Sequence, residues 1–77
     1  PDRETRLQIL RAKSRVAGGG VPEATLAFLA EHLRGNVREL EGALQSVRHY
    51  ARVTGRPADV ALAREALGEL LRHAVRV

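Results

Sequence analysis

The sequence predicts an all-α fold, a small bundle of three or four helices that forms a single domain. Clusters of Gly and Pro divide the 77 residues into four segments, at positions 18–22, 35 and 55–57. Within these segments apolar residues recur at spacings of three and four, which is the period of an amphipathic helix. No segment has the sustained alternation of a strand, so the pieces around Val21 and Ala58 can form at most one short β-bridge.

The first two segments have recognisable helix starts. Asp2 is a candidate N-cap for the first helix. Pro22 is expected in the first turn of the second helix, and Gly35 is expected to end that helix. The apolar face of the first helix is modest and consists of Leu7, Ile9, Leu10, Ala12 and Val16. The stripe of the second consists of Leu26, Leu29, Ala30 and Leu33.

The third and fourth segments carry the most regular patterns. Asn36 and Glu39 have the spacing of a capping box, so the third helix is predicted to begin there and to run to Gly55. Asp59 is the expected N-cap of the fourth helix. The apolar face of the fourth helix is expected to consist of Val60, Ala63, Leu67, Leu70 and Ala74. The predicted core consists of Val37, Leu40, Leu44, Val47, Leu26, Leu29, Leu33, Leu67 and Leu70.

The composition predicts a soluble, cytoplasmic chain without catalytic groups of its own. Cys is absent, and the apolar runs are far shorter than the roughly 20 residues that span a bilayer. The formal charge of +4 favours anionic partners. The three His residues have no metal-ligand spacing, and the Gly run at 18–20 lacks the Lys and hydroxyl of a phosphate loop. We therefore predict no metal site and no catalytic residue, and we interpret the Gly run as a flexible connector.

Arg38 is the strongest candidate for a functional residue. It lies two residues after the predicted N-cap, where the positive end of the helix dipole disfavours a cation. An anion docked there would be attracted by the dipole, the free N–H groups and the guanidinium together. The alternatives are a solvated Arg38 or one paired with Glu41. Gly42, in the middle of the helix, suggests that another backbone or a ligand packs closely on its face. Arg48 is expected to be an ordinary surface residue.

Three stretches of the chain resemble a known family. The run GNVRELEGAL at 35–44 closely resembles the sensor 2 motif of the DnaA family of replication initiators. The opening PDRETRLQIL is similar to the start of the helical lid in that family, and GRPADVALAREAL at 55–67 is similar to a third family stretch. The Gly run and Ala58-Asp59 depart from the family pattern, which usually has a more polar loop and an Ile-Thr pair.

The resemblance implies that residues 1–77 are the lid subdomain of an AAA+ ATPase, a fragment of a larger protein. Arg38 would be the sensor 2 arginine on the nucleotide phosphates, with Ile9 and Val37 near the adenine. The parent protein would use ATP or ADP with Mg²⁺, whereas this fragment would hold no cofactor and catalyse nothing alone. Its partners would be the large subdomain, neighbouring protomers and origin DNA, and no membrane span is expected.

Two other functions stay open from the sequence. The first is a DnaA-related regulatory ATPase that lacks the DNA-binding domain, because it would contain the same lid. The second is a free-standing helix-turn-helix DNA binder, because the second and third helices are joined by a short turn and the chain is basic. Glu39 and Glu41 near the start of the third helix oppose that second function, since carboxylates repel a phosphate backbone.

Overall fold

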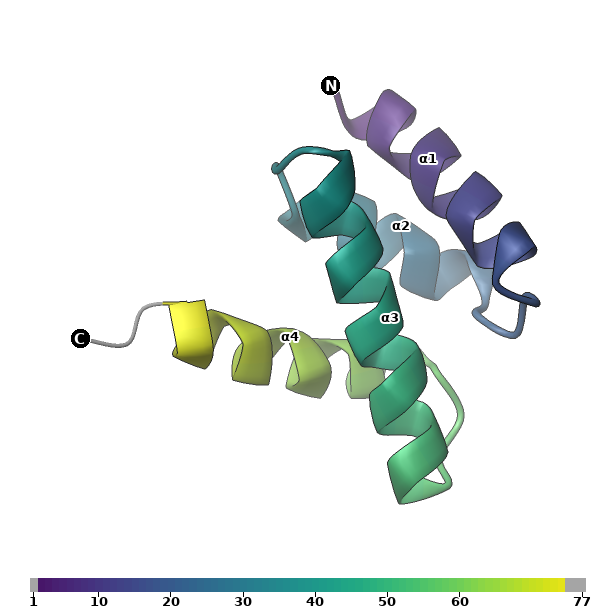
Figure 1. Ribbon diagram of the computed structural model, residues 1–77, viewed down its shortest axis with the longest axis vertical. Helices are drawn as coiled ribbons and strands as arrows, with labels where there is room; N and C mark the ends of the chain where they lie inside the picture. Colours follow the sequence, from purple (N-terminus) through teal and green to yellow (C-terminus); the bar gives the residue numbers. More distant parts are fainter. Residues whose placement is uncertain (1, 75–77) are drawn as a thin grey trace.

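The computed structural model describes residues 2–74, and the side chains of residues 2–68. The four helices are α1 (Arg3–Val16), α2 (Glu23–His32), α3 (Val37–Thr54) and α4 (Val60–Ala74) (Figure 1). The predicted all-α fold is confirmed, and residues 2–74 contain neither a strand nor the β-bridge allowed by the sequence. None of the described helices is long and apolar enough to cross a membrane.

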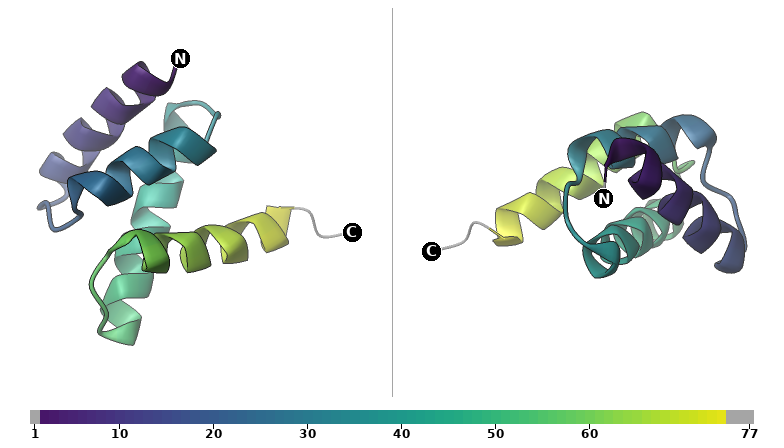
Figure 2. Two further views of the ribbon diagram at one scale, coloured as in Figure 1. Left: turned by 180° about the vertical axis from the view of Figure 1, so that it is seen from behind. Right: turned by 90° about the horizontal axis from the view of Figure 1, so that it is seen from above.

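Helices α2 and α3 form the centre of the bundle. Each of them packs against all three other helices, whereas α1 and α4 make no contact with each other within the described residues. Figure 2 shows this arrangement from two further sides, with α1 and α2 stacked beside α3 and with α4 crossing it. The core therefore lies between α3 and the other helices. It consists of Leu7, Leu10, Leu26, Leu29, Ala30, Leu40, Leu44, Val47, Ala58, Leu62, Ala63 and Ala66.

The predicted core is confirmed on α3 except at its first residue. Val37 is 44% exposed and is not a core residue. Val37 lies in the first turn of α3, at one edge of the buried stripe, and Ala43 lies at the other edge. Because of this position no neighbouring helix covers the Val37 side chain. Leu33 is only partly buried and packs against the edge of the core, because α2 ends at His32, one residue earlier. The side chain of Leu70 lies outside the described residues.

The faces of α1 and α4 differ from the predicted ones. Leu7 and Leu10 are buried on α1, whereas Val16 at its C-terminal end is 87% exposed. On α4 the buried residues are Leu62, Ala63, Ala66 and Leu67, and Val60 is only half-buried. The reason is that α4 packs against both α2 and α3. Two neighbouring helices bury a wider apolar face than the single row of residues at spacings of three and four that the sequence predicted.

The predicted helix caps are largely confirmed. The Asp2 and Asp59 carboxylates accept hydrogen bonds from the backbone N–H groups of Thr5 and Leu62, at 2.8 and 2.9 Å. Gly55 ends α3 with φ +69°, the left-handed conformation that favours Gly.

The termini of α2 differ from the prediction. Pro22 is the flanking residue rather than a member of the first turn. The helix ends at His32, not at Gly35, because Leu33 turns the chain into an extended conformation. The α2–α3 connection is therefore longer than the predicted turn.

Polar contacts tie the helices together around the core. The fully buried Thr25 hydroxyl donates to the carbonyl of Ala58 at 2.8 Å, which joins α2 to the segment before α4. Arg11 on α1 pairs with Glu23 on α2, and its hydrogen bonds hold the pKa of the Glu23 carboxyl below its usual range. Both partners of this pair are exposed, so its contribution to stability is small.

Gly42 has no packing partner inside the chain. A Cβ built at this position meets no atom within 4 Å, and the residue is exposed. The expectation that a neighbouring backbone packs closely on it is therefore wrong for the described residues. We predict that Gly42→Ala raises the free energy of unfolding by about 0.5–1 kcal/mol, because Gly disfavours helix and the site has room. Urea unfolding followed by circular dichroism measures this, with Gly55→Ala as a contrast that should be destabilising.

Leu44 lies at the centre of the core, where 2% of its surface is exposed. We predict that Leu44→Ala lowers the free energy of unfolding by about 2–5 kcal/mol, because the truncation leaves a cavity under three helices. The same urea titration tests this, with the 67%-exposed Val53 replaced by Ala as the matched control. A Leu44→Ala variant as stable as the control would contradict the assigned core.

Candidate functional site

The N-terminal end of α3 is built by a closed set of local contacts. The Asn36 side chain accepts from the Glu39 backbone N–H at 3.0 Å, and the Glu39 carboxylate accepts from the Asn36 backbone N–H at 3.1 Å. This is the predicted capping box. Gly35 makes it possible, because a Cβ there would lie 1.7 Å from the Glu39 carboxylate oxygen. The first five residues of the GNVRELEGAL run thus form one unit whose geometry the box fixes.

The capping box leaves two backbone donors unused. The N–H groups of Asn36 and Glu39 are satisfied inside the box, whereas those of Val37 and Arg38 have no partner among the described residues. These two groups lie at the positive end of the helix dipole. One negative charge, that of Glu39, is already present there and is bound to a backbone N–H. An added anion would therefore approach the free N–H groups beside that carboxylate.

The Arg38 side chain is exposed and forms no ion pair or hydrogen bond within the described part of the chain. The predicted alternative partner, Glu41, is instead 3.8 Å from the Lys13 ammonium group on α1. The pairing of Arg38 with Glu41 is therefore not observed. Arg38 can point its guanidinium at an anion outside the chain without breaking a contact inside it.

Ile9 lies in the middle of α1, level with the first turn of α3 that contains Val37 and Arg38. Helices α1 and α3 run side by side in the same direction, because Lys13 pairs with Glu41 and, further along both helices, Ala17 accepts from Arg48 (Figure 1). Ile9 precedes Lys13 by one helical turn, and Val37 precedes Glu41 by one turn. Ile9 is half-buried against the core, and Val37 exposes much of its side chain. The structure thus places Ile9 level with Val37 and Arg38 along the α1–α3 pair, and no contact joins the three residues in the described part of the chain.

This end of α1 and α3 offers a partial site. It supplies one cation, two N–H donors and two apolar side chains, which can bind the edge of an anionic ligand but cannot surround it. Among the described residues no three His, Asp or Glu side chains gather closely enough to hold a metal ion. The arrangement therefore suits a ligand whose main binding groups lie on another domain.

Arg48 has a role that the sequence interpretation missed. Its guanidinium donates to the carbonyls of Ala17, at 2.7 Å, and Gly19. It therefore fastens the α1–α2 loop to α3, so the Gly run is an anchored turn rather than a free connector. All three Gly residues at 18–20 have positive φ angles, a conformation that Gly adopts at little cost, so the turn can form. Arginines recur every four residues at positions 48, 52 and 56. This spacing is the sequence signal that could have predicted a row of arginines on one side of the chain, including Arg48.

Comparison with known proteins supports the resemblance seen in the motifs. No family model matches the chain. The chromosomal replication initiator protein DnaA of Methylibium petroleiphilum is 51% identical to it over 71 residues, which cover 92% of this chain and 15% of that protein. The similarity includes most of the described helices, and the chain spans only a small part of the relative. The chain is therefore related to the DnaA family of chromosomal replication initiators and corresponds to one segment of such a protein.

Proposed function

We propose that this chain is the helical lid of a DnaA-type initiator ATPase and that Arg38 is its sensor 2 arginine. The observation that carries this proposal is the exposed, unpaired Arg38 beside two free N–H groups in the GNVRELEGAL run. A cation at a helix N-terminus is locally unfavourable, so its presence there is explained best by an anion that binds it. The capping box holds the donors in place before that anion arrives.

The proposed ligand is a nucleotide whose phosphates are held mainly by the large subdomain of the parent protein. Arg38 would reach the γ-phosphate from the lid through charge-assisted hydrogen bonds. Loss of that phosphate would remove the contact and release the lid, which would couple the nucleotide state to assembly on origin DNA. Ile9 in the middle of α1 and Val37 at the start of α3 would lie against the adenine. Mg²⁺ would belong to the large subdomain, and this role would be cytoplasmic.

A DnaA-related regulator without a DNA-binding domain would use the same lid in the same way. A free-standing helix-turn-helix is less consistent with the described contacts. Its recognition helix would have to be α3, whose first turn presents Val37 and Arg38 beside the Glu39 carboxylate. That carboxylate is engaged in the capping box and is not available to read a base.

The chain alone should neither bind ATP tightly nor hydrolyse it. One arginine and one helix end lack the phosphate loop and the Mg²⁺ ligands that supply most of the affinity. Isothermal calorimetry with ATP and Mg²⁺ tests this, together with a phosphate-release assay. Micromolar binding or turnover by the 77 residues would contradict the proposed partial site.

Arg38→Ala in the full-length protein should weaken the distinction between ATP and ADP more than it weakens nucleotide binding overall. The lost contact is worth roughly 1.5–3 kcal/mol, so ATP-dependent assembly on origin DNA should fall about ten- to a hundredfold. The measurements are ATP and ADP affinity and nucleotide-dependent oligomer formation.

Arg15→Ala is the matched control, because Arg15 is an exposed arginine on α1 with no side-chain contact among the described residues. Arg48 is unsuitable, because it holds the α1–α2 loop. Wild-type assembly by Arg38→Ala, or a loss of assembly explained entirely by unfolding, would show that Arg38 is not the sensor.

A further inference from the structure

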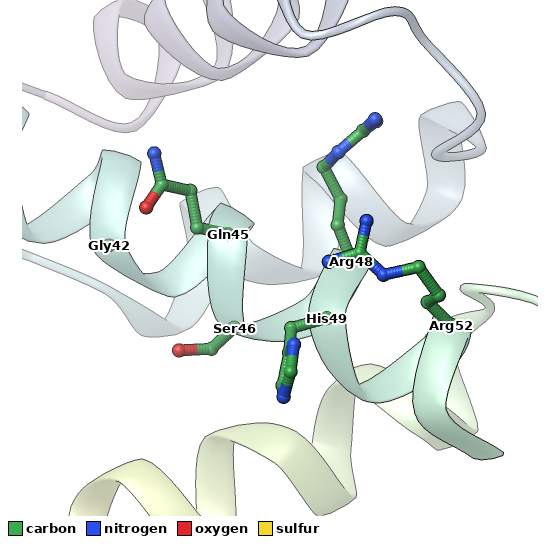
Figure 3. Close-up of a pocket in the computed structure, with 6 residues that line it drawn as sticks. All are labelled: Gly42, Gln45, Ser46, Arg48, His49 and Arg52. Atoms are coloured by element: carbon green, nitrogen blue, oxygen red, sulfur yellow. The ribbon is translucent and has the colours of Figure 1, made fainter.

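The outer face of α3 carries a groove that begins one helical turn after Arg38 and becomes basic toward the C-terminal end of the helix. Two adjoining hollows, of about 480 and 340 Å³, share Arg48 and Arg52 in their linings. We call them together the α3 groove. The larger hollow is lined by Gly42, Gln45, Ser46, Arg48, His49 and Arg52 (Figure 3). In Figure 3, Gln45 points to the side of α3 where α1 lies, Arg48 points toward the α1–α2 loop, and Ser46 and His49 point toward α4. The groove therefore runs along α3 between two rows of polar side chains.

The charge of the groove is positive and comes from Arg48, Arg52 and Arg56. No carboxylate lines either hollow. Arg52 is exposed and has no partner among the described side chains, so its charge is available to a ligand. Arg48 donates to two carbonyl groups, but these neutral acceptors leave its charge uncompensated. Arg56, in the smaller hollow, is partly neutralised by Glu65, whose pKa its hydrogen bonds lower.

Gly42 supplies an independent indication that something outside the chain approaches this face. A Gly in the middle of a helix costs about 1 kcal/mol relative to Ala, and no atom of the chain lies close enough to require its missing side chain. The position also forms one end of the larger hollow. A side chain there would fill the space in which a ligand backbone could rest.

We propose that the α3 groove binds the sugar–phosphate backbone of duplex DNA without reading its sequence. Its arginine, amide, hydroxyl and imidazole donors extend over the eight residues 45–52 of α3, or about 12 Å at 1.5 Å per residue. One DNA strand presents a phosphate about every 3.4 Å, so this row can follow several phosphates. Side chains of these types are the usual donors to phosphate oxygens. The groove begins at Gly42, one helical turn after Arg38 and on the same face of α3, and the inference does not depend on the proposed role of Arg38.

The lining also argues against the other anionic macromolecules. Protein interfaces depend on buried aromatic and large apolar anchors, and the larger hollow offers no Leu, Ile, Phe, Tyr or Trp. Single-stranded nucleic acid is held largely by stacking on aromatic side chains, and the two hollows offer no Phe, Tyr or Trp and only the His49 imidazole. A groove that carries three arginines, and whose apolar lining is limited to Val21, Ala51, Pro57 and Ala58 in the smaller hollow, fits a duplex backbone best.

The test uses the 77-residue chain without nucleotide, after circular dichroism has confirmed its helices. Fluorescence anisotropy measures its affinity for a labelled duplex of about 16 base pairs, in two unrelated sequences, between about 50 and 200 mM salt. We expect equal affinity for both sequences and a steep loss of affinity with salt. Arg52→Ala should weaken binding about five- to tenfold near 0.1 M salt and reduce the log–log salt slope by about one, the effect of one lost phosphate contact.

Two further variants separate a groove from diffuse charge. Arg34→Ala removes the same charge at an exposed position outside the groove and should change affinity little. Gly42→Leu keeps the net charge and has room in the fold, yet it fills the groove and should weaken binding. The proposal is overturned if the duplex does not bind at low salt, or if Arg34→Ala loses as much as Arg52→Ala. It is also overturned if Gly42→Leu binds like the parent chain, or if a polyglutamate peptide or the single strand binds more tightly than the duplex.

Discussion

The burial of one apolar stripe of α3 beneath α1, α2 and α4 is the constraint on which the rest of this structure depends. Leu40, Leu44 and Val47 are almost fully enclosed, and every other helix packs against this stripe or against its immediate neighbours. A buried stripe fixes the rotation of a helix about its axis, because 3.6 residues per turn leave little freedom once one face is covered. The rotation of α3 then decides which of its polar residues face outward.

The two ends of α3 consequently offer different chemistry. At the start of α3, the capping box and Gly35 fix the first turn, where Arg38 lies beside two backbone N–H groups that have no partner among the described residues. Val37 adds apolar surface next to them. Further along, the outward face presents a line of neutral and cationic donors around Arg48 and Arg52. The first arrangement suits a compact phosphate group held jointly with another domain, whereas the second suits a repeating polyanion. Both surfaces lie on the same helix, so α3 fixes the distance between Arg38 and the arginines of the groove.

The polar links at the periphery hold the helices in register without driving the fold. Lys13 and Glu41 connect α1 to α3, and both are substantially exposed, so their attraction is screened by water and salt. The contacts of Arg48 with the α1–α2 loop are different, because a guanidinium that satisfies two loop carbonyls replaces backbone partners that the loop otherwise lacks. This explains how a run of three glycines, which has a high conformational entropy when unfolded, is held as a defined turn.

The sequence by itself determined the helices, most of their caps and the position of Arg38 after the Asn36 cap, because these follow from contacts between residues close along the chain. A ten-residue motif also pointed to the similarity with a DnaA replication initiator that the sequence comparison shows. Tertiary structure alone decided that Val37 is exposed, that no described atom packs against the Cβ position of Gly42, and that Arg48 holds the α1–α2 loop against α3. These properties depend on which helices cover a given face and where each neighbouring helix ends. Residues distant in the sequence set those limits, and no local pattern encodes them.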